Sequence, residues 1–258
     1  MDIKLGIIVM AGYAFYFAVR IIFRRRFNVI LCVFMVFQLA SMAARAVELR
    51  QFPIVSVADT LALLSFILMV FYFLMNVGYS VKEARFPDVF FGLAALFILC
   101  AGVVLYLFSG EIVVRDELKT VLLPMHVIPA MLGYAFFTAG FAGAAANIAG
   151  TVYGKEWAGK IGSFSFRANI AGNIFFGIGA LVIGSIWSRV AWGSFWTWDA
   201  KETFSLATFL VYSIYLFLGL RKKLDGLKLS FVCVACYCLL LFTYVGVTYF
   251  MQGRHSYR

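Results

Sequence analysis

Long apolar runs dominate the pattern of hydrophobic and polar positions along this chain. They cover residues 5–23, 27–44, 58–76, 88–108, 125–147, 166–187, 203–220 and 229–250. Each run is close to the roughly 20 residues that an α-helix needs to cross a bilayer. The runs are continuous rather than alternating, which argues against a β-barrel. The pattern therefore predicts an all-α polytopic membrane protein with about eight transmembrane helices and an external Trp-rich loop between the sixth and seventh.

The composition agrees with this class. The chain has 258 residues, of which 64% are hydrophobic, whereas soluble domains have about 45–50% apolar residues. No repeat, linker or second domain is visible, so we expect one integral membrane domain over residues 1–258, embedded in a lipid bilayer. The net charge is +10, but much of the basic charge lies in short connections between spans, and we expect no nucleic-acid partner.

The basic clusters orient the predicted spans. Arg24–Arg26 and Arg221–Lys223 follow the first and seventh runs, and the positive-inside rule places both clusters in the cytoplasm. Both termini are then outside, as is a loop over residues 45–57, while residues 148–165 form a cytoplasmic loop. Arg20 is expected to reach the lipid headgroups at the cytoplasmic end of the first span.

The predicted external loop over residues 187–203 is rich in tryptophan and in charge. It holds four of the five tryptophans, Trp187, Trp192, Trp196 and Trp198, which is more than an ordinary aromatic belt at a membrane interface requires. If residues 192–199 are helical, Trp192, Trp196 and Asp199 share one face. Stacked indoles suit a porphyrin plane, and Arg189 or Lys201 could bind its propionates. Alternatively, Asp199, Lys201 and Glu202 cap the seventh span; both roles are compatible.

The chain has two histidines, His126 and His255. A single histidine at a helix end is ordinarily a surface residue. On the predicted topology, however, both lie on the same outer face as the Trp-rich loop. Neutral imidazole is a common metal ligand and holds haem iron axially. The pattern therefore favours a haem site at the outer face.

Other polar groups inside the spans are open to two interpretations. Arg167, Asn169 and Asn173 lie close together in the sixth run, where polar groups are costly and often functional, although packing between helices explains them equally well. The five cysteines all lie inside apolar runs. The pair Cys233 and Cys236 is followed by tyrosine rather than histidine, so it is no haem-attachment motif, and we expect both to be packing residues.

Several motifs resemble one known family. The segment from Trp192 to Thr203, Trp-Gly-Ser-Phe-Trp-Thr-Trp-Asp-Ala-Lys-Glu-Thr, is similar to the tryptophan-rich WWD motif of the CcsA/ResC-type cytochrome c biogenesis proteins, with CcmC and CcmF as more distant relatives. His126-Val127 resembles that family's first external histidine, and Gly253–Tyr257 resembles its C-terminal ending, which carries the second. Arg45 and the Phe52-Pro53 turn look like its early loop. The likeness covers most of the chain and is strongest from about residue 119 to the end.

This resemblance implies the haem-handling subunit of a cytochrome c haem lyase or synthase in the bacterial inner membrane, with both termini periplasmic. The haem-handling part would span about residues 110–258. Haem b, bound transiently as substrate, would be presented on the periplasmic face for thioether attachment to the CxxCH motif of apocytochrome c, with a CcsB/ResB-type membrane partner. The implied axial ligands are His126 and His255, and the other implied haem contacts are Arg189, Trp192, Gly193, Trp196, Trp198, Asp199 and Lys201.

The sequence departs from the family in two places. Ala200 stands where the family usually has proline, and Phe217 stands where relatives often carry a histidine inside the membrane. Because that histidine is absent, the resemblance supports haem binding at the outer face more than haem transport across the membrane. The alternatives are a cofactor-free transporter and a membrane redox subunit that retains haem. A cofactor-free transporter favours two related halves with broken helices, which are not visible here. A redox subunit that retains haem favours histidines paired across the bilayer, whereas both histidines here lie at one edge.

Overall fold

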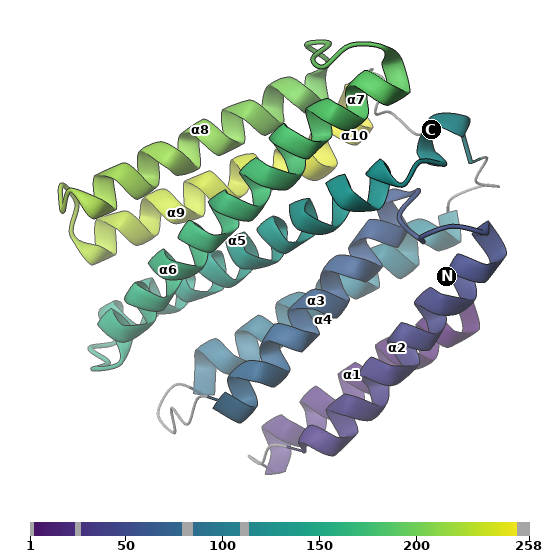
Figure 1. The fold of residues 1–258 in the computed structure, drawn as a ribbon. Helices are drawn as coiled ribbons and strands as arrows, with labels where there is room; N and C mark the ends of the chain where they lie inside the picture. Colours follow the sequence, from purple (N-terminus) through teal and green to yellow (C-terminus); the bar gives the residue numbers. More distant parts are fainter. Residues whose placement is uncertain (1–2, 24–26, 79–84, 109–113, 252–258) are drawn as a thin grey trace. The chain divides into compact units, whose positions relative to one another are not determined.

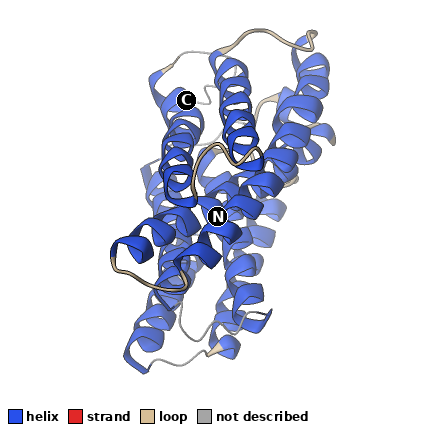
Figure 2. Ribbon diagram, turned by 90° about the vertical axis from the view of Figure 1, so that its left-hand side faces the viewer, coloured by secondary structure: helices blue, strands red, loops and turns tan. Residues whose placement is uncertain are grey.

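The computed structural model describes residues 3–23, 27–78, 85–108 and 114–251. Throughout these ranges the chain forms helices and their connections, with no strand (Figure 2). The contacts divide the chain into two units, Met1–Lys119 and Thr120–Arg258. The boundary lies close to the start of the predicted haem-handling part. An all-α membrane protein, as expected from the apolar runs, is confirmed.

The first unit is a four-helix bundle formed by α1 (Ile3–Phe23), α2 (Asn28–Leu49), α3 (Val57–Gly78) and α4 (Arg85–Phe108). Helix α1 packs against α2 and α4, and α3 packs against the same two helices, so the four close into a ring. Aromatic side chains fill part of its interior, where Tyr16 and Tyr72 lie edge to face with their ring centres 6.2 Å apart. The unit ends with a short 3₁₀ turn, η1 (Asp116–Leu118).

Polar side chains join the helices of this first bundle. The hydroxyl of Tyr13 donates to Gln38 Oε1 at 2.7 Å, and Gln38 Nε2 donates to the Ala62 carbonyl at 3.1 Å. These bonds link α1, α2 and α3 in surroundings where an unsatisfied polar group would be costly. Arg20 was expected to reach the headgroups, and this was wrong. Only 7% of its surface is exposed, and its guanidinium lies over the ring of Tyr72, 5.9 Å from the ring centre.

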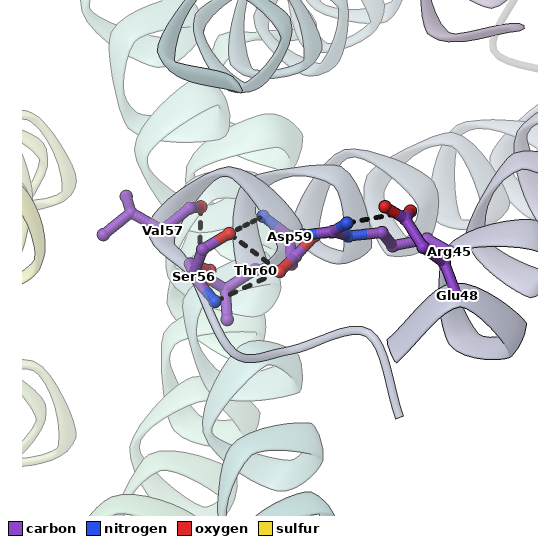
Figure 3. Close-up of polar contacts among 6 residues, drawn as sticks. All are labelled: Arg45, Glu48, Ser56, Val57, Asp59 and Thr60. Carbon is purple, nitrogen blue, oxygen red and sulfur yellow. Dashed lines mark hydrogen bonds and ion pairs between the residues drawn. The ribbon is translucent and has the colours of Figure 1, made fainter. Parts of the chain in front are cut away.

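The connection between α2 and α3 is held by charged groups (Figure 3). Ser56 Oγ accepts from the Asp59 amide at 3.1 Å, and the Ser56 amide donates to Asp59 Oδ2 at 3.1 Å, which is the reciprocal capping box of a helix start. Arg45 pairs with Glu48 at 2.8 Å and with Asp59 at 3.5 Å. The predicted outer loop over residues 45–57 was therefore too long, because α2 continues to Leu49.

The second unit contains four long helical segments. They are α5 (Leu122–Val152), then α6 (Ala158–Phe176) continued by η2 (Gly177–Ile183) and α7 (Gly184–Trp192), then α8 (Ala200–Leu220), and finally α9 (Gly226–Leu241) continued by η3 (Phe242–Gly246) and α10 (Val247–Phe250). The segments η2 and η3 are π-helical. In Figure 1, α5, α6, α8 and α9 run side by side, and the chain reverses at each connection. The predicted cytoplasmic loop over residues 148–165 was wrong in its extent, because α5 and α6 cover most of it.

Small residues and hydrogen bonds bring these helices together. Asn169 Nδ2 donates to Cys233 Sγ at 3.2 Å, which joins α6 to α9, and Asn173 Nδ2 donates to Ser213 Oγ at 3.0 Å, which joins α6 to α8. Of the two interpretations open for these asparagines, interhelical packing is the one that the contacts support. Arg167, by contrast, is exposed. Cys233 is fully buried, as a packing residue should be.

Seven helices in the described ranges are long and apolar enough to cross a membrane. An eighth, α4, has a described apolar part, Phe91–Leu107, that is shorter. The predicted spans coincide with these helices, with differences of a few residues at most ends and larger ones around α5 and α6.

Candidate functional site

The start of α5 brings His126 against the π-helix η2. His126 Nδ1 lies 2.9 Å from the carbonyl oxygen of Gly179. A carbonyl can only accept a hydrogen bond, so Nδ1 carries the proton and donates it. In the neutral imidazole the lone pair is then on Nε2, and the ring is held in one tautomer and one orientation.

Two glycines make this close approach possible. A Cβ on Gly179 would lie 2.3 Å from the Ala130 amide nitrogen, so the backbones of η2 and α5 touch at that point. A Cβ on Gly184 would lie 3.0 Å from both Cε1 and Nδ1 of His126. The π-helical winding also shifts the hydrogen-bond pattern of the backbone, and such segments occur frequently at functional sites. The close approach of η2 to α5 therefore requires glycine at position 179, and glycine at position 184 leaves the imidazole room next to η2.

Trp187 fixes the other side of the imidazole. Its ring is stacked on that of His126, with centres 5.7 Å apart and planes inclined by 6°. Trp187 is only 1% exposed, and Trp192 lies edge to face with it at 4.8 Å. Trp187 was predicted to lie in the Trp-rich loop but was not among the predicted haem contacts. Its partner on α5 could not be identified from spacing within one helix.

The predicted loop over residues 187–203 is shorter in the structure, because α7 extends to Trp192 and α8 begins at Ala200. Residues 193–199 have no regular structure, so the condition for a shared helical face, a helix over residues 192–199, is not met. Helix α7 ends at Trp192, where Gly193 has φ of 82° and its amide donates to the Arg189 carbonyl. Glycine suits this left-handed position because it has no Cβ. The connection then runs without regular structure to Asp199. Trp192, Trp196 and Asp199 consequently do not share a helix face.

Asp199 is the N-cap of α8, and this alternative is confirmed. Its side chain accepts from the amides of Lys201 at 2.8 Å and Glu202 at 3.2 Å. Within the connection, the rings of Trp196 and Trp198 lie edge to face with centres 6.0 Å apart. The loop thus carries a second pair of indoles, next to the cap.

Glu202 connects this loop to α7. It is 9% exposed, and its Oε2 accepts from the Thr197 amide at 2.7 Å and from Thr197 Oγ1 at 3.0 Å. Its Oε1 accepts from Ser188 Oγ at 3.2 Å. Glu202 was expected to take part in the helix cap. The structure shows that it reaches beyond the cap, because the loop folds back over the first turn of α8.

The two cations predicted to meet a bound anion are placed differently. Arg189 is exposed, and its guanidinium lies over the ring of Phe195 and donates to the Gly193 carbonyl. Lys201 Nζ instead donates to the Tyr244 carbonyl at 2.9 Å and to Thr248 Oγ1 at 2.8 Å. Lys201 therefore ties the start of α8 to η3 and α10. Among the residues that the structure describes at this end of the second unit, Arg189 is the exposed cation.

The remaining aromatic side chains of the loop face outward. Phe195 is 57% exposed and Trp198 is 72% exposed. Trp198 also has φ of 58°, an uncommon backbone conformation for a residue with a side chain. His255 lies outside the described residues, so its predicted place near this loop stays a prediction.

The site therefore occupies one end of the second unit. The start of α5, the α7–α8 connection and the end of α10 lie together there (Figure 1). It combines an imidazole of fixed tautomer, four indoles and an exposed guanidinium. In the described part of the chain, no group of three or more His, Cys, Asp or Glu side chains could hold a metal ion.

Comparison with known proteins gives the site a family. Residues 54–255 match the family described as Cytochrome C assembly protein. This chain belongs to that family. The matched segment includes His126, the Trp-rich loop and His255. The resemblance inferred from the motifs is thereby confirmed.

Individual family members with similar sequences are named Cytochrome c biogenesis protein CcsA. The protein from Prochlorococcus marinus (strain NATL1A) is 37% identical over 98 residues, which are 38% of this chain and 31% of that protein. The protein from Chlamydomonas reinhardtii is 39% identical over 98 residues, 38% of this chain and 28% of that protein. The protein from Guizotia abyssinica is 35% identical over 105 residues, 41% of this chain and 32% of that protein. The match thus spans about a third of the length of these relatives.

Proposed function

We propose that this protein is the haem-binding membrane subunit of a cytochrome c synthesis machinery. It presents haem b at the outer face of the membrane for thioether attachment to the CxxCH motif of apocytochrome c. The observation that carries this proposal is the hydrogen bond from His126 Nδ1 to Gly179. It sets the tautomer in which Nε2 has the lone pair that an axial ligand of haem iron requires.

The other site residues support the same ligand. Trp187 holds the imidazole ring in place, and Trp192, Trp196 and Trp198 offer further aromatic surface to a porphyrin plane. The indole Nε1 of Trp196 is buried, and no described group accepts its proton. A bound carboxylate oxygen would satisfy it. The exposed guanidinium of Arg189 suits a propionate, and His255 is the proposed second axial ligand.

The distribution of charge supports an outer location for the site. The opposite end of the second unit, formed by the α5–α6 and α8–α9 connections, carries exposed basic side chains. They are Lys155, Lys160, Arg221, Lys222, Lys223 and Lys228. Basic connections favour the cytoplasmic side. The Trp-rich end then faces the periplasm of a bacterial cell, where both termini also lie.

The reaction needs further proteins. The chain itself holds and orients the haem. The apocytochrome supplies the two thiols that add to the vinyl groups and the histidine that replaces one of the axial ligands of the assembly factor. A CcsB/ResB-type membrane protein is the partner that the family resemblance implies. The haem-handling subunit thus acts by positioning, and no acid–base pair is assigned to it.

The visible spectrum of the full chain tests this proposal. The protein is purified in detergent as wild type, His126→Gly and His255→Gly, and the haem content per protein is measured from its absorption. We expect each glycine variant to lose most of its haem, because one of two axial bonds is gone, and to regain it when imidazole is added. Haem content that is the same in all three proteins contradicts the axial assignment.

A further inference from the structure

Glu202 holds two separate parts of the site with its two oxygens. Oε2 accepts both the amide and the hydroxyl of Thr197, at 2.7 Å and 3.0 Å. Oε1 accepts the hydroxyl of Ser188 at 3.2 Å. Thr197 belongs to the loop, whereas Ser188 belongs to α7. One carboxylate on α8 thus connects the loop and α7.

Both contacts of Glu202 are with residues that adjoin tryptophans. Thr197 lies directly between Trp196 and Trp198, whose rings form one pair. Ser188 follows Trp187, whose ring is stacked on the imidazole of His126. Ser188 is 2% exposed, and its single hydroxyl proton is shared between Glu202 Oε1 and the Ser194 carbonyl, which lies 2.8 Å from the hydroxyl, so Ser188 also contacts the loop directly. The carboxylate therefore holds the segment that carries the two loop indoles next to the segment that carries Trp187, whose ring supports the proposed iron ligand.

The chemical surroundings suit a carboxylate that serves this purpose. Its hydrogen bonds come from one amide and two hydroxyl groups, and none of the described cations pairs with it. Hydrogen bonds to an ionised acceptor are roughly twice as strong as neutral ones. The first turn of α8 also favours a negative charge. These contributions offset the cost of burying the charge.

We propose that Glu202 is the positioning residue of this site. It fixes the distance and orientation between the Trp196–Trp198 pair and the His126–Trp187 stack. The inference rests on the proposed haem function for its purpose, but the geometry it describes exists in the protein without haem. A flat ligand that contacts both indole groups needs them in one fixed relation, because a loop free to shift would bind it more weakly.

Variants at position 202 separate geometry from charge. Glu202→Ala removes every bond of the carboxylate. Glu202→Gln keeps an oxygen for Thr197 and can donate its amide protons to Ser188, so it should restore most of the geometry. Ser188→Ala removes the bond between Glu202 and α7 together with the bond from Ser188 to the Ser194 carbonyl. Glu156→Ala is the matched control, because Glu156 is exposed in the α5–α6 connection at the opposite end of the unit.

The first measurement needs no haem. Near-ultraviolet circular dichroism of the full chain in detergent reports the fixed surroundings of tryptophan rings, and far-ultraviolet circular dichroism reports helix content. We expect Glu202→Ala to lose much of the near-ultraviolet signal while its helix content is unchanged. Glu202→Gln should restore the signal, and Glu156→Ala should match the wild type. A wild-type near-ultraviolet spectrum in Glu202→Ala overturns the proposal.

The second measurement uses haem b as the probe. Haem is titrated into the same proteins, and affinity and Soret position are recorded. We expect about tenfold weaker binding in Glu202→Ala with a shifted Soret band, about threefold weaker binding in Ser188→Ala, and a smaller loss in Glu202→Gln. Wild-type affinity and spectrum in Glu202→Ala overturn the positioning role. If Glu202→Ala does not fold, Ser188→Ala carries the test, and its wild-type behaviour in both measurements has the same meaning.

The outcomes also separate this inference from the proposed function. If His126→Gly binds haem as the wild type does, the axial assignment fails, yet the near-ultraviolet result still decides whether Glu202 organises the loop. If His126→Gly loses haem and Glu202→Ala is unaffected in both measurements, the proposed function stands and the positioning role fails.

Discussion

Two helix starts in this protein share one local pattern but use it differently. In α3 the pattern is Ser56-x-x-Asp59, and in α8 it is Asp199-x-x-Glu202. Each places a capping side chain before the helix and an acid three residues later, which is the signature of a capping box. In α3 the acid returns to the cap, whereas in α8 it does not.

The partners of the two acids explain the difference. Asp59 closes its box on Ser56 and pairs with the buried guanidinium of Arg45 (Figure 3). Glu202 leaves the cap to Asp199 and binds Thr197 and Ser188. The acid of α3 balances a charge that must be buried, while the acid of α8 organises a loop. The same signature can therefore serve stability in one place and a site in another, depending on what the chain folds against it.

The difference between the two acids is tested most strongly by removing the charge of each while keeping its shape. Asp59→Asn leaves the buried guanidinium of Arg45 without its buried partner, and we expect a loss of about 3 kcal/mol in the free energy of unfolding. Glu202→Gln keeps neutral donors satisfied and should cost about 1 kcal/mol or less. Unfolding in mixed detergent micelles measures both.

A double variant provides the control for that result. Arg45→Met combined with Asp59→Asn removes both charges and should recover most of the lost stability, because no unpaired charge stays buried. Asp116→Asn, at an exposed position in η1, should have little effect. Equal losses of the free energy of unfolding in Asp59→Asn and Glu202→Gln would contradict the view that only Asp59 balances a buried charge.

The cations of the two regions give a second test. Arg45 of α2 pairs with Asp59, the acid at the start of α3. Lys201, at the start of α8, instead donates to the Tyr244 carbonyl and to Thr248 Oγ1. Lys201→Met removes both bonds and should lower the free energy of unfolding by about 2 kcal/mol, since each is a charge-assisted bond. Lys223→Met, at an exposed position, is the control. A stability of Lys201→Met equal to that of the control shows that the tie between α8 and η3 is unimportant.

The helices that precede α3 and α8 both end in a left-handed residue, but only the one before α8 has glycine there. Helix α2 ends with Arg50 at φ of 54°, and α7 ends with Gly193 at φ of 82°. Arg50→Gly should raise the free energy of unfolding by about 1 kcal/mol, and Gly193→Ala should lower it by about 1 kcal/mol, because only glycine adopts this conformation without strain. Thermal unfolding measures both, with Gly159→Ala as an unstrained control in α6. Changes of the same sign at positions 50 and 193 disagree with the backbone assignment.

The exposed start of α9 should show the smallest effect. The amide and side chain of Lys228 hydrogen-bond to Asp225 and hold the pKa of that carboxyl below its usual range. A lowered pKa means that the cap stabilises the helix at neutral pH and loses this effect as the pH falls through the folded-state pKa. The stability difference between wild type and Asp225→Asn should therefore shrink when the pH is lowered from 7 to below about 4. A difference that is independent of pH excludes this contribution.

Sequence patterns predicted some features of this protein and not others. The apolar runs predicted the membrane helices because burial in lipid demands long apolar segments, whatever their neighbours. The cap at Asp199 was predicted for a similar reason, since it depends on residues close in sequence. The shared face of Trp192, Trp196 and Asp199 depended on a helix over residues 192–199 and does not form, because α7 ends at Trp192 and the chain turns at Gly193.

What the sequence by itself determined is the membrane class, the approximate spans, the family resemblance and the residue types gathered in one loop. All of these depend on local composition or on short motifs. Only the tertiary structure decided that His126 donates to Gly179, that Trp187 stacks on the imidazole and that Glu202 connects Thr197 to Ser188. The reason is physical: a hydrogen bond or a ring contact between helices depends on where separate segments pack, and neither periodicity nor spacing within one segment specifies that.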